Sequence, residues 1–208
     1  MSVQTEHAAA VNAGSPSGQG FDAFEFDSAS GLYVLCDGAN SCVDGGLAAR
    51  WLARALAGNF QADTTGKSTL AQVMLCHEQM QQKFPEAGST FVRVAVGEQG
   101  VELSGVGDSF IWLFRRRWLG WGPWALWASL PRHLDTDGNP SQMVGSEVCD
   151  QVHVLRALPR GDYYAVMMSD GPGAMISVFH ILQRLQILGS RRPSSEDLDY
   201  VCRALAQQ

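Results

Sequence analysis

Hydrophobic residues alternate with polar ones over several short stretches of the chain and recur at helical spacing over others. Alternation with a period of two is typical of half-buried strands, and spacings of three and four are typical of amphipathic helices. Turn sequences rich in glycine separate the strand-like stretches. The pattern predicts strands at Phe21–Asp27, Leu32–Cys36, Thr90–Val96, Val101–Val106, Phe110–Arg116, Val152–Leu158 and Tyr163–Met168. It predicts helices from Ser41 to about Gly58, and over Thr69–Phe84, Ala174–Leu188 and Ser194–Ala206.

Short turns between neighbouring strands predict hairpins. Gly31 separates the first two strands, Gly97 to Gly100 the third and fourth, Gly107-Asp108 the fourth and fifth, and Pro159 to Asp162 the last two. The order is a strand pair, two helices, a run of antiparallel strands and two helices, which favours the α+β class. We expect a four-layer α-β-β-α sandwich, in which helices flank two mainly antiparallel sheets.

Length, charge and cysteine content narrow the class of protein. A chain of 208 residues with 46% hydrophobic residues suits one domain, expected over 15–208 after a flexible tail at 1–14. The net charge of −6 argues against nucleic acid or an anionic membrane as the main partner. Five scattered cysteines fit reduced thiols, and neither a signal peptide nor a membrane span is evident. The expected location is the cytoplasm.

Acidic residues occur at the ends of predicted strands. Asp22 lies beside the first strand, while Asp37, Asp108 and Asp170 follow others, and glycine adjoins three of the four acids. Hard divalent cations prefer several oxygen ligands, and rigid strand ends hold carboxylates at fixed separations. The four acids, with the backbone carbonyl of Gly38, are therefore candidate metal ligands.

The ordered set of motifs resembles the metal-dependent protein phosphatases of the PPM (type 2C) family, bacterial type. The resemblance spans roughly residues 15 to 208. The motifs that carry it are Phe21-Asp22-Ala23-Phe24, Leu32 to Gly38 with the helix after it, Gly88-Ser89-Thr90, Gly107-Asp108-Ser109 and Ser169-Asp170-Gly171. The resemblance implies the α-β-β-α sandwich and a binuclear Mn²⁺ or Mg²⁺ site. It also implies a signalling hydrolase in which a metal-bridging hydroxide attacks phosphoserine or phosphothreonine.

The resemblance also implies a role for each candidate ligand. Asp37 would bridge both metals and Gly38 would add its carbonyl oxygen. Asp22 would act mainly through a coordinated water, and Asp170 would bind the first metal. Asp108 matches the acid that helps to hold a third, weaker ion. Asp37 and Asp170 are accordingly the candidate catalytic residues.

Two features depart from the family pattern. The family's phosphate-gripping arginine, five residues before the first acid, is replaced by Ser17. The final Asp-Asn motif and its strand have no counterpart between Asp170 and Gln208, which implies that one ligand and one strand are missing. A shortened chain, completion by another chain, and a degenerate relative are the alternatives. The alternative function is a catalytically weakened PPM-like module that binds a phosphoprotein or a regulatory partner.

Several aromatic and imidazole side chains lie outside these motifs. Five tryptophans gather between Trp112 and Trp127, next to Arg115, Arg116 and Arg117. Such a cluster is typical of a hairpin at a sheet edge, and partly exposed aromatic residues make it a candidate surface for a protein partner. The histidines show no metal-binding spacing.

Overall fold

The computed structural model describes residues 20–27, 29–58, 67–97, 100–118, 121–158, 161–188 and 194–206. The strands are β1 (Asp22–Asp27), β2 (Leu32–Gly38), β3 (Ser89–Gly97), β4 (Gly100–Val106), β5 (Phe110–Trp118), β6 (Trp121–Ser129), β7 (His153–Ala157) and β8 (Tyr163–Met168). The helices are α1 (Gly45–Gly58), α2 (Lys67–Lys83), α3 (Asp170–Met175), α4 (Val178–Ile187) and α5 (Ser195–Ala206). The expected tail at 1–14 and Ser17 lie outside the described residues.

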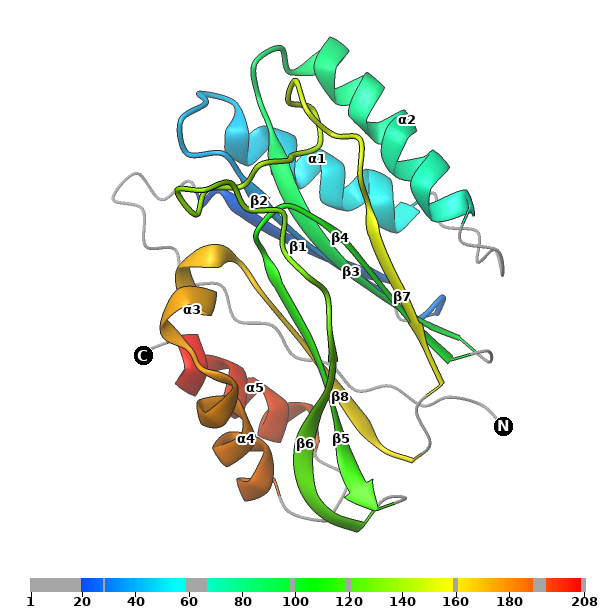
Figure 1. Cartoon of the computed structure of the whole chain (residues 1–208), viewed down its shortest axis with the longest axis vertical. Coiled ribbons are helices and arrows are strands. Elements are labelled where there is room, and N and C mark those ends of the chain that lie inside the picture. The colour runs from blue at the N-terminus through cyan, green and yellow to red at the C-terminus, as the bar shows by residue number, and fades with distance from the viewer. Residues whose placement is uncertain are drawn as a thin grey trace.

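Two antiparallel sheets form the centre of the protein. The first has five strands in the order β1-β2-β3-β4-β7, and the second has three in the order β6-β5-β8. Helices α1 and α2 cover the first sheet, and α4 and α5 cover the second (Figure 1). The α+β class and the four-layer arrangement predicted from the sequence are confirmed. None of the helices in the described ranges is long and apolar enough to cross a membrane.

Alternation along the strands produces three separate hydrophobic cores. Leu32, Val34 and Cys36 of β2 face α1 and α2, while Tyr33 joins a cluster between the two sheets. In β5, Ile111 and Leu113 join that central cluster, whereas Phe114 packs with residues of α4 and α5. Odd-numbered residues of β2 therefore point between the sheets, which is the side on which Asp37 also lies.

Three details of the predicted organisation are wrong. The strands on either side of Gly107-Asp108 do not form a hairpin, because β4 pairs with β3 and β7 while β5 pairs with β6 and β8. The strands on either side of Pro159–Asp162 do not form one either, because β7 pairs with β4 and β8 pairs with β5. At both places the chain passes from one sheet to the other. The single helix predicted at Ala174–Leu188 is two helices, α3 and α4. Ser177 caps α4 by accepting a hydrogen bond from the His180 backbone N–H at 3.3 Å, which separates the two.

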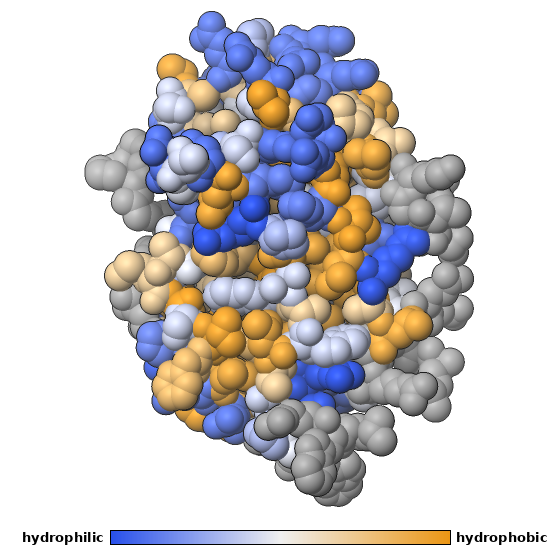
Figure 2. All heavy atoms as spheres, in the orientation of Figure 1, coloured by the Kyte–Doolittle hydropathy of each residue, from blue (hydrophilic) through white to orange (hydrophobic). Residues whose placement is uncertain are grey.

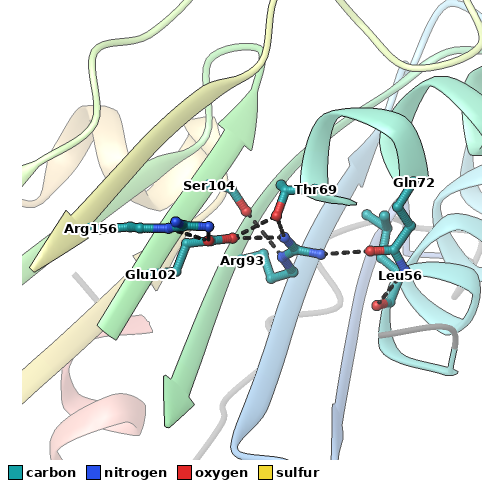
Figure 3. A network of polar contacts seen from close by, with 7 residues as sticks. All are labelled: Leu56, Thr69, Gln72, Arg93, Glu102, Ser104 and Arg156. Atoms are coloured by element: carbon teal, nitrogen blue, oxygen red, sulfur yellow. Dashed lines mark hydrogen bonds and ion pairs between the residues drawn. The ribbon is translucent and has the colours of Figure 1, made fainter. Parts of the chain in front are cut away.

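A buried arginine joins α2 to the first sheet (Figure 3). Arg93 of β3 is fully buried, and its guanidinium donates to Thr69 and Gln72 of α2 at 2.8 and 2.9 Å. It also donates to Ser104 at 3.0 Å and forms an ion pair with Glu102 of β4 at 3.1 Å. One side chain of β3 thus satisfies polar groups from two other elements, α2 and β4.

Candidate metal centre

The pairing of β1 with β2 places the first two candidate acids side by side. Asp22 and Asp37 are opposite each other in the antiparallel register, so their side chains leave the same face of the sheet. That face looks toward the second sheet. The Asp37 carboxyl is in hydrogen-bonding contact with Asp22.

The start of α3 brings the third acid to the same place from the second sheet. Asp170 is the first residue of α3, directly after β8, and its carboxyl is in hydrogen-bonding contact with Asp37. Ser169 precedes it in extended conformation and makes no side-chain cap of the helix. Its hydroxyl donates instead to the Asp22 carboxylate at 3.1 Å, which ties the two sheets together at this end.

Burial and neighbouring negative charges raise the pKa values of Asp22, Asp37 and Asp108. Burial, the negative charges of Asp22 and Asp170 and the more distant charge of Asp108 raise the pKa of Asp37 to about 8. Burial also raises the pKa of Asp22, against hydrogen bonds from Ser169 and Asp37 that lower it. Burial and the charge of Asp170 raise the pKa of Asp108. The structure therefore brings all four predicted acids close enough to interact.

The donor set suits a hard cation in charge and chemistry. Within the described ranges, no three His, Cys, Asp or Glu side chains have the spacing of a preformed metal site. The Asp37 carboxyl instead contacts Asp22 and Asp170 directly. Because burial and these neighbours raise the pKa of Asp37 to about 8, its carboxyl carries a proton at neutral pH. A protonated acid amid carboxylates relieves repulsion as a cation would, so these residues fit Mn²⁺ or Mg²⁺ once the proton leaves.

Two glycines at the site are required by close packing. A Cβ at Gly38 would lie 2.1 Å from the carbonyl oxygen of Gly45, at the start of α1. At Gly107 the backbone has a φ of +98°, and a Cβ would lie 2.4 Å from Thr90. The glycine of the second Asp-Gly pair differs, because nothing lies within 4 Å of a Cβ at Gly171. The two Asp-Gly pairs therefore differ in their packing: Gly38 is required by a close contact, and Gly171 is not.

A glycine farther along α3 sets the position of that helix. A Cβ at Gly173 would lie 2.0 Å from the Phe110 ring. We expect Gly173→Ala to lower the free energy of unfolding by about 1–3 kcal/mol, because the added methyl overpacks this contact. Gly171→Ala is the matched control on the same helix and should be neutral or slightly stabilising. Urea denaturation of both variants measures the difference; equal values would contradict the packing role.

His133 is a structural residue of this region that the sequence did not indicate. Its ring Nδ1 accepts a hydrogen bond from the Gly107 backbone N–H at 3.1 Å. The backbone N–H of His133 donates to the Gly107 carbonyl oxygen at 2.8 Å. Its ring stacks on that of His153, with 4.0 Å between the ring centres. These contacts fasten the loop between β6 and β7 to the turn that carries Asp108. An isolated histidine in a polar loop carries no spacing signal that could have predicted this.

The tryptophan-rich hairpin is largely engaged within the molecule. Trp124 is buried and packs on Tyr164 with 4.5 Å between ring centres. The guanidinium groups of Arg115 and Arg116 stack over Trp127 and Trp124. Hydrophobic side chains gather in the lower left of Figure 2, where Figure 1 places α4 and β6. Exposed side chains in these segments include Leu126, Phe179 and Ile187. A protein partner at Trp112–Trp127 remains a prediction.

The same fold occurs in solved bacterial phosphatases. The serine/threonine phosphatase Stp1 from Staphylococcus aureus aligns with a TM-score of 0.67 at 16% identity, over 90% of this chain and 84% of that one. The PPM Ser-Thr phosphatase MsPP from Mycobacterium smegmatis aligns with a TM-score of 0.68 at 17% identity, over 98% and 88%. PppA from Pseudomonas aeruginosa gives 0.67 at 18% identity, over 90% and 82%. No protein-family model and no curated protein sequence matches the chain. The chain thus has the PPM phosphatase fold.

Proposed function

We propose that this chain is a member of the PPM family and a metal-dependent protein phosphatase that hydrolyses phosphoserine and phosphothreonine monoesters. The observation that carries the proposal is the convergence of Asp22, Asp37, Asp108 and Asp170 at one end of a fold shared with such enzymes. Acids this close repel one another and cost stability. A functional cation site accounts for their being held together.

The proposed cofactors are two, or with Asp108 three, Mn²⁺ or Mg²⁺ ions. Asp37 would lie between two of them, Asp170 would hold the first, and the Gly38 carbonyl would add an oxygen ligand. Asp22 would act through a water molecule and is oriented for this by the Ser169 hydroxyl. When bound, the cations would acidify a water molecule and neutralise charge on the phosphate.

The reaction is a displacement at phosphorus. A water oxygen forms a bond to phosphorus while the bond from phosphorus to the seryl or threonyl oxygen breaks, and that oxygen takes up a proton as it leaves. The chain's own carboxylates hold the positions that surround this water and phosphate. Rigid strand ends and the start of α3 limit the movement of these carboxylates. Groups that are already in position contribute to the rate of hydrolysis, because less entropy is lost on reaching the transition state.

The raised pKa of Asp37 makes metal binding depend on pH. Because Asp37 is protonated below about pH 8, a cation must displace that proton to use the carboxylate. We expect Mn²⁺ affinity to increase from about pH 6 to about pH 8.5, with release of about one proton per bound site. Calorimetric titration in buffers of different ionisation enthalpy measures both. Affinity that is constant over this range would contradict the protonated state of Asp37.

The direct test is turnover of p-nitrophenyl phosphate and of a phosphothreonine peptide, with and without Mn²⁺. We expect hydrolysis that needs Mn²⁺ or Mg²⁺ and is removed by a chelator. A protein that binds Mn²⁺ and the peptide without hydrolysing either substrate would instead be the weakened binding module. A protein that binds neither would exclude both functions.

A further inference from the structure

A cluster of four acids poses a problem for a substrate that is itself a dianion. Carboxylates repel the phosphate of a phosphomonoester, and bound cations offset only part of this charge. A guanidinium at the edge of the site would supply the missing attraction, because its planar fork matches phosphate oxygens. An arginine close to the four acids would meet this need.

Arg132 has that position. Its guanidinium carbon lies 4.2 Å from the centre of the Phe110 ring. The Phe110 ring in turn meets Gly173 of α3, the helix that begins with Asp170, and Phe110 lies two residues after Asp108. The positive charge of Arg132 also lowers the pKa of Asp108 against the burial that raises it. The guanidinium is thus held over a ring that is in contact with the segments carrying two of the acids.

The backbone at Arg132 is fixed in place. The next residue, His133, exchanges two hydrogen bonds with Gly107, from its backbone N–H at 2.8 Å and to its ring at 3.1 Å. The Arg132 side chain itself is exposed. Among the ion pairs of the described residues, none uses Arg132. Its hydrogen-bond donors are therefore available to a ligand at the site.

We propose that Arg132 binds the phosphate group of the substrate, stacked on Phe110 and tethered to the Asp108 turn through His133. The ligand class is a phosphomonoester dianion, and inorganic phosphate shares its chemistry. This inference rests on the proposed metal-dependent function, because the acids must be neutralised by cations before a phosphate can approach. Arg132 is a substrate-positioning residue that takes no proton.

The test measures binding of inorganic phosphate and of a phosphoserine peptide to the Mn²⁺-loaded protein by calorimetry. We expect Arg132→Ala to weaken both by roughly 10- to 100-fold, the range for a lost charge-assisted contact. Arg132→Lys, which keeps the charge and loses the fork, should fall between. Arg203→Ala removes another exposed arginine, from α5, where it pairs with Asp199 at 2.8 Å, and should leave binding unchanged.

Affinity for Mn²⁺ separates recognition from a structural role. Removing a positive charge near Asp108 should leave the Mn²⁺ affinity of Arg132→Ala equal to or higher than that of the unaltered protein. Phosphate binding that is unchanged in Arg132→Ala would overturn the proposal. So would a parallel loss of Mn²⁺ affinity and thermal stability, which would show that Arg132 only holds the loop.

Turnover distinguishes this proposal from the proposed function. If the unaltered protein binds phosphate through Arg132 but hydrolyses no substrate, the inference stands and the phosphatase function fails. If the unaltered protein hydrolyses substrate and Arg132→Ala retains its KM, the function stands and the inference fails. Support for both is an increase in KM of roughly 10-fold or more with a smaller change in kcat.

Discussion

Replacement of Asp37 by Asn is expected to stabilise the metal-free protein. The pKa of Asp37 is about 8 in the fold and 3.8 in the unfolded reference. The folded protein therefore binds a proton more tightly, and its stability decreases as pH rises from about 4 to about 8. Asn removes this titration, and its amide N–H can donate to Asp170 in place of the carboxyl O–H of Asp37. We expect a gain on the order of 1–3 kcal/mol near pH 8, and little change near pH 4.

The same replacement should remove activity and metal binding. Asn is neutral and a weaker ligand, so Mn²⁺ affinity should fall sharply, and kcat by roughly 10²- to 10³-fold. Thermal denaturation without Mn²⁺ measures the stability of the metal-free protein, and the change in Tm on adding Mn²⁺ reports metal binding. Mn²⁺ should raise the Tm of the unaltered protein and not that of Asp37→Asn. Asp137→Asn, in an exposed turn, removes the same charge elsewhere and should behave like the unaltered protein.

An outcome in which Asp37→Asn is less stable than the unaltered protein near pH 8 would contradict the repulsion between the acids. Retention of full metal-dependent turnover would contradict the role of Asp37 as a ligand. The two readouts are separate, because stability is measured without metal and turnover with it.

Replacement of Arg93 by Ala is expected to have the largest effect on stability. The variant removes the donor to Thr69 and Gln72 and one of the two arginines that pair with Glu102. Removal of one partner from a buried ion pair costs about 3–5 kcal/mol, a large share of the stability of a typical domain. Urea denaturation at neutral pH measures the change. Amide hydrogen exchange should show that α2 loses protection first, because Arg93 fastens it to the sheet.

The same network provides a control. Arg156 of β7 pairs with the other oxygen of Glu102 at 3.0 Å, but its side chain is 40% exposed. Water solvates such a pair, so Arg156→Ala should cost only about 0–1 kcal/mol. Equal losses in Arg93→Ala and Arg156→Ala would mean that burial of the guanidinium is not what matters (Figure 3).

The sequence predicted the positions of most strands and helices well, and the pairing of the strands less well. Period-two alternation is a local property, so most strands were predicted nearly in full. Which strand pairs with which depends on contacts between distant residues, and Pro159–Asp162 has the composition of a hairpin turn although it joins two sheets. A large hydrophobic side chain does not by itself mark the buried face of a helix: Leu47 of α1 and Leu70 of α2 are half exposed. In α1, Ala48 and Ala49 are buried, because small residues let the helix approach the sheet closely.

The four acids were identified because strand ends are visible in a sequence. Their approach to one another was not visible in any single stretch, since it requires β1 to pair with β2 and α3 to follow β8. Arg132, His133 and Phe110 gave no signal, because their roles arise only when the loop before β7 folds back on the Asp108 turn. Local sequence thus indicated the candidate ligands, and the long-range packing determines what surrounds them.

The hydrogen bond from Ser169 to Asp22 joins residues that are 147 positions apart. During synthesis, β1 to β4 with α1 and α2 emerge within the first 106 residues. Asp22 and Asp37 are therefore made long before Asp170 leaves the ribosome. The proposed metal centre cannot be complete until β8 and α3 have emerged, so a nascent chain that lacks them should bind Mn²⁺ weakly. Cation uptake would then mark the moment at which the protein is finished.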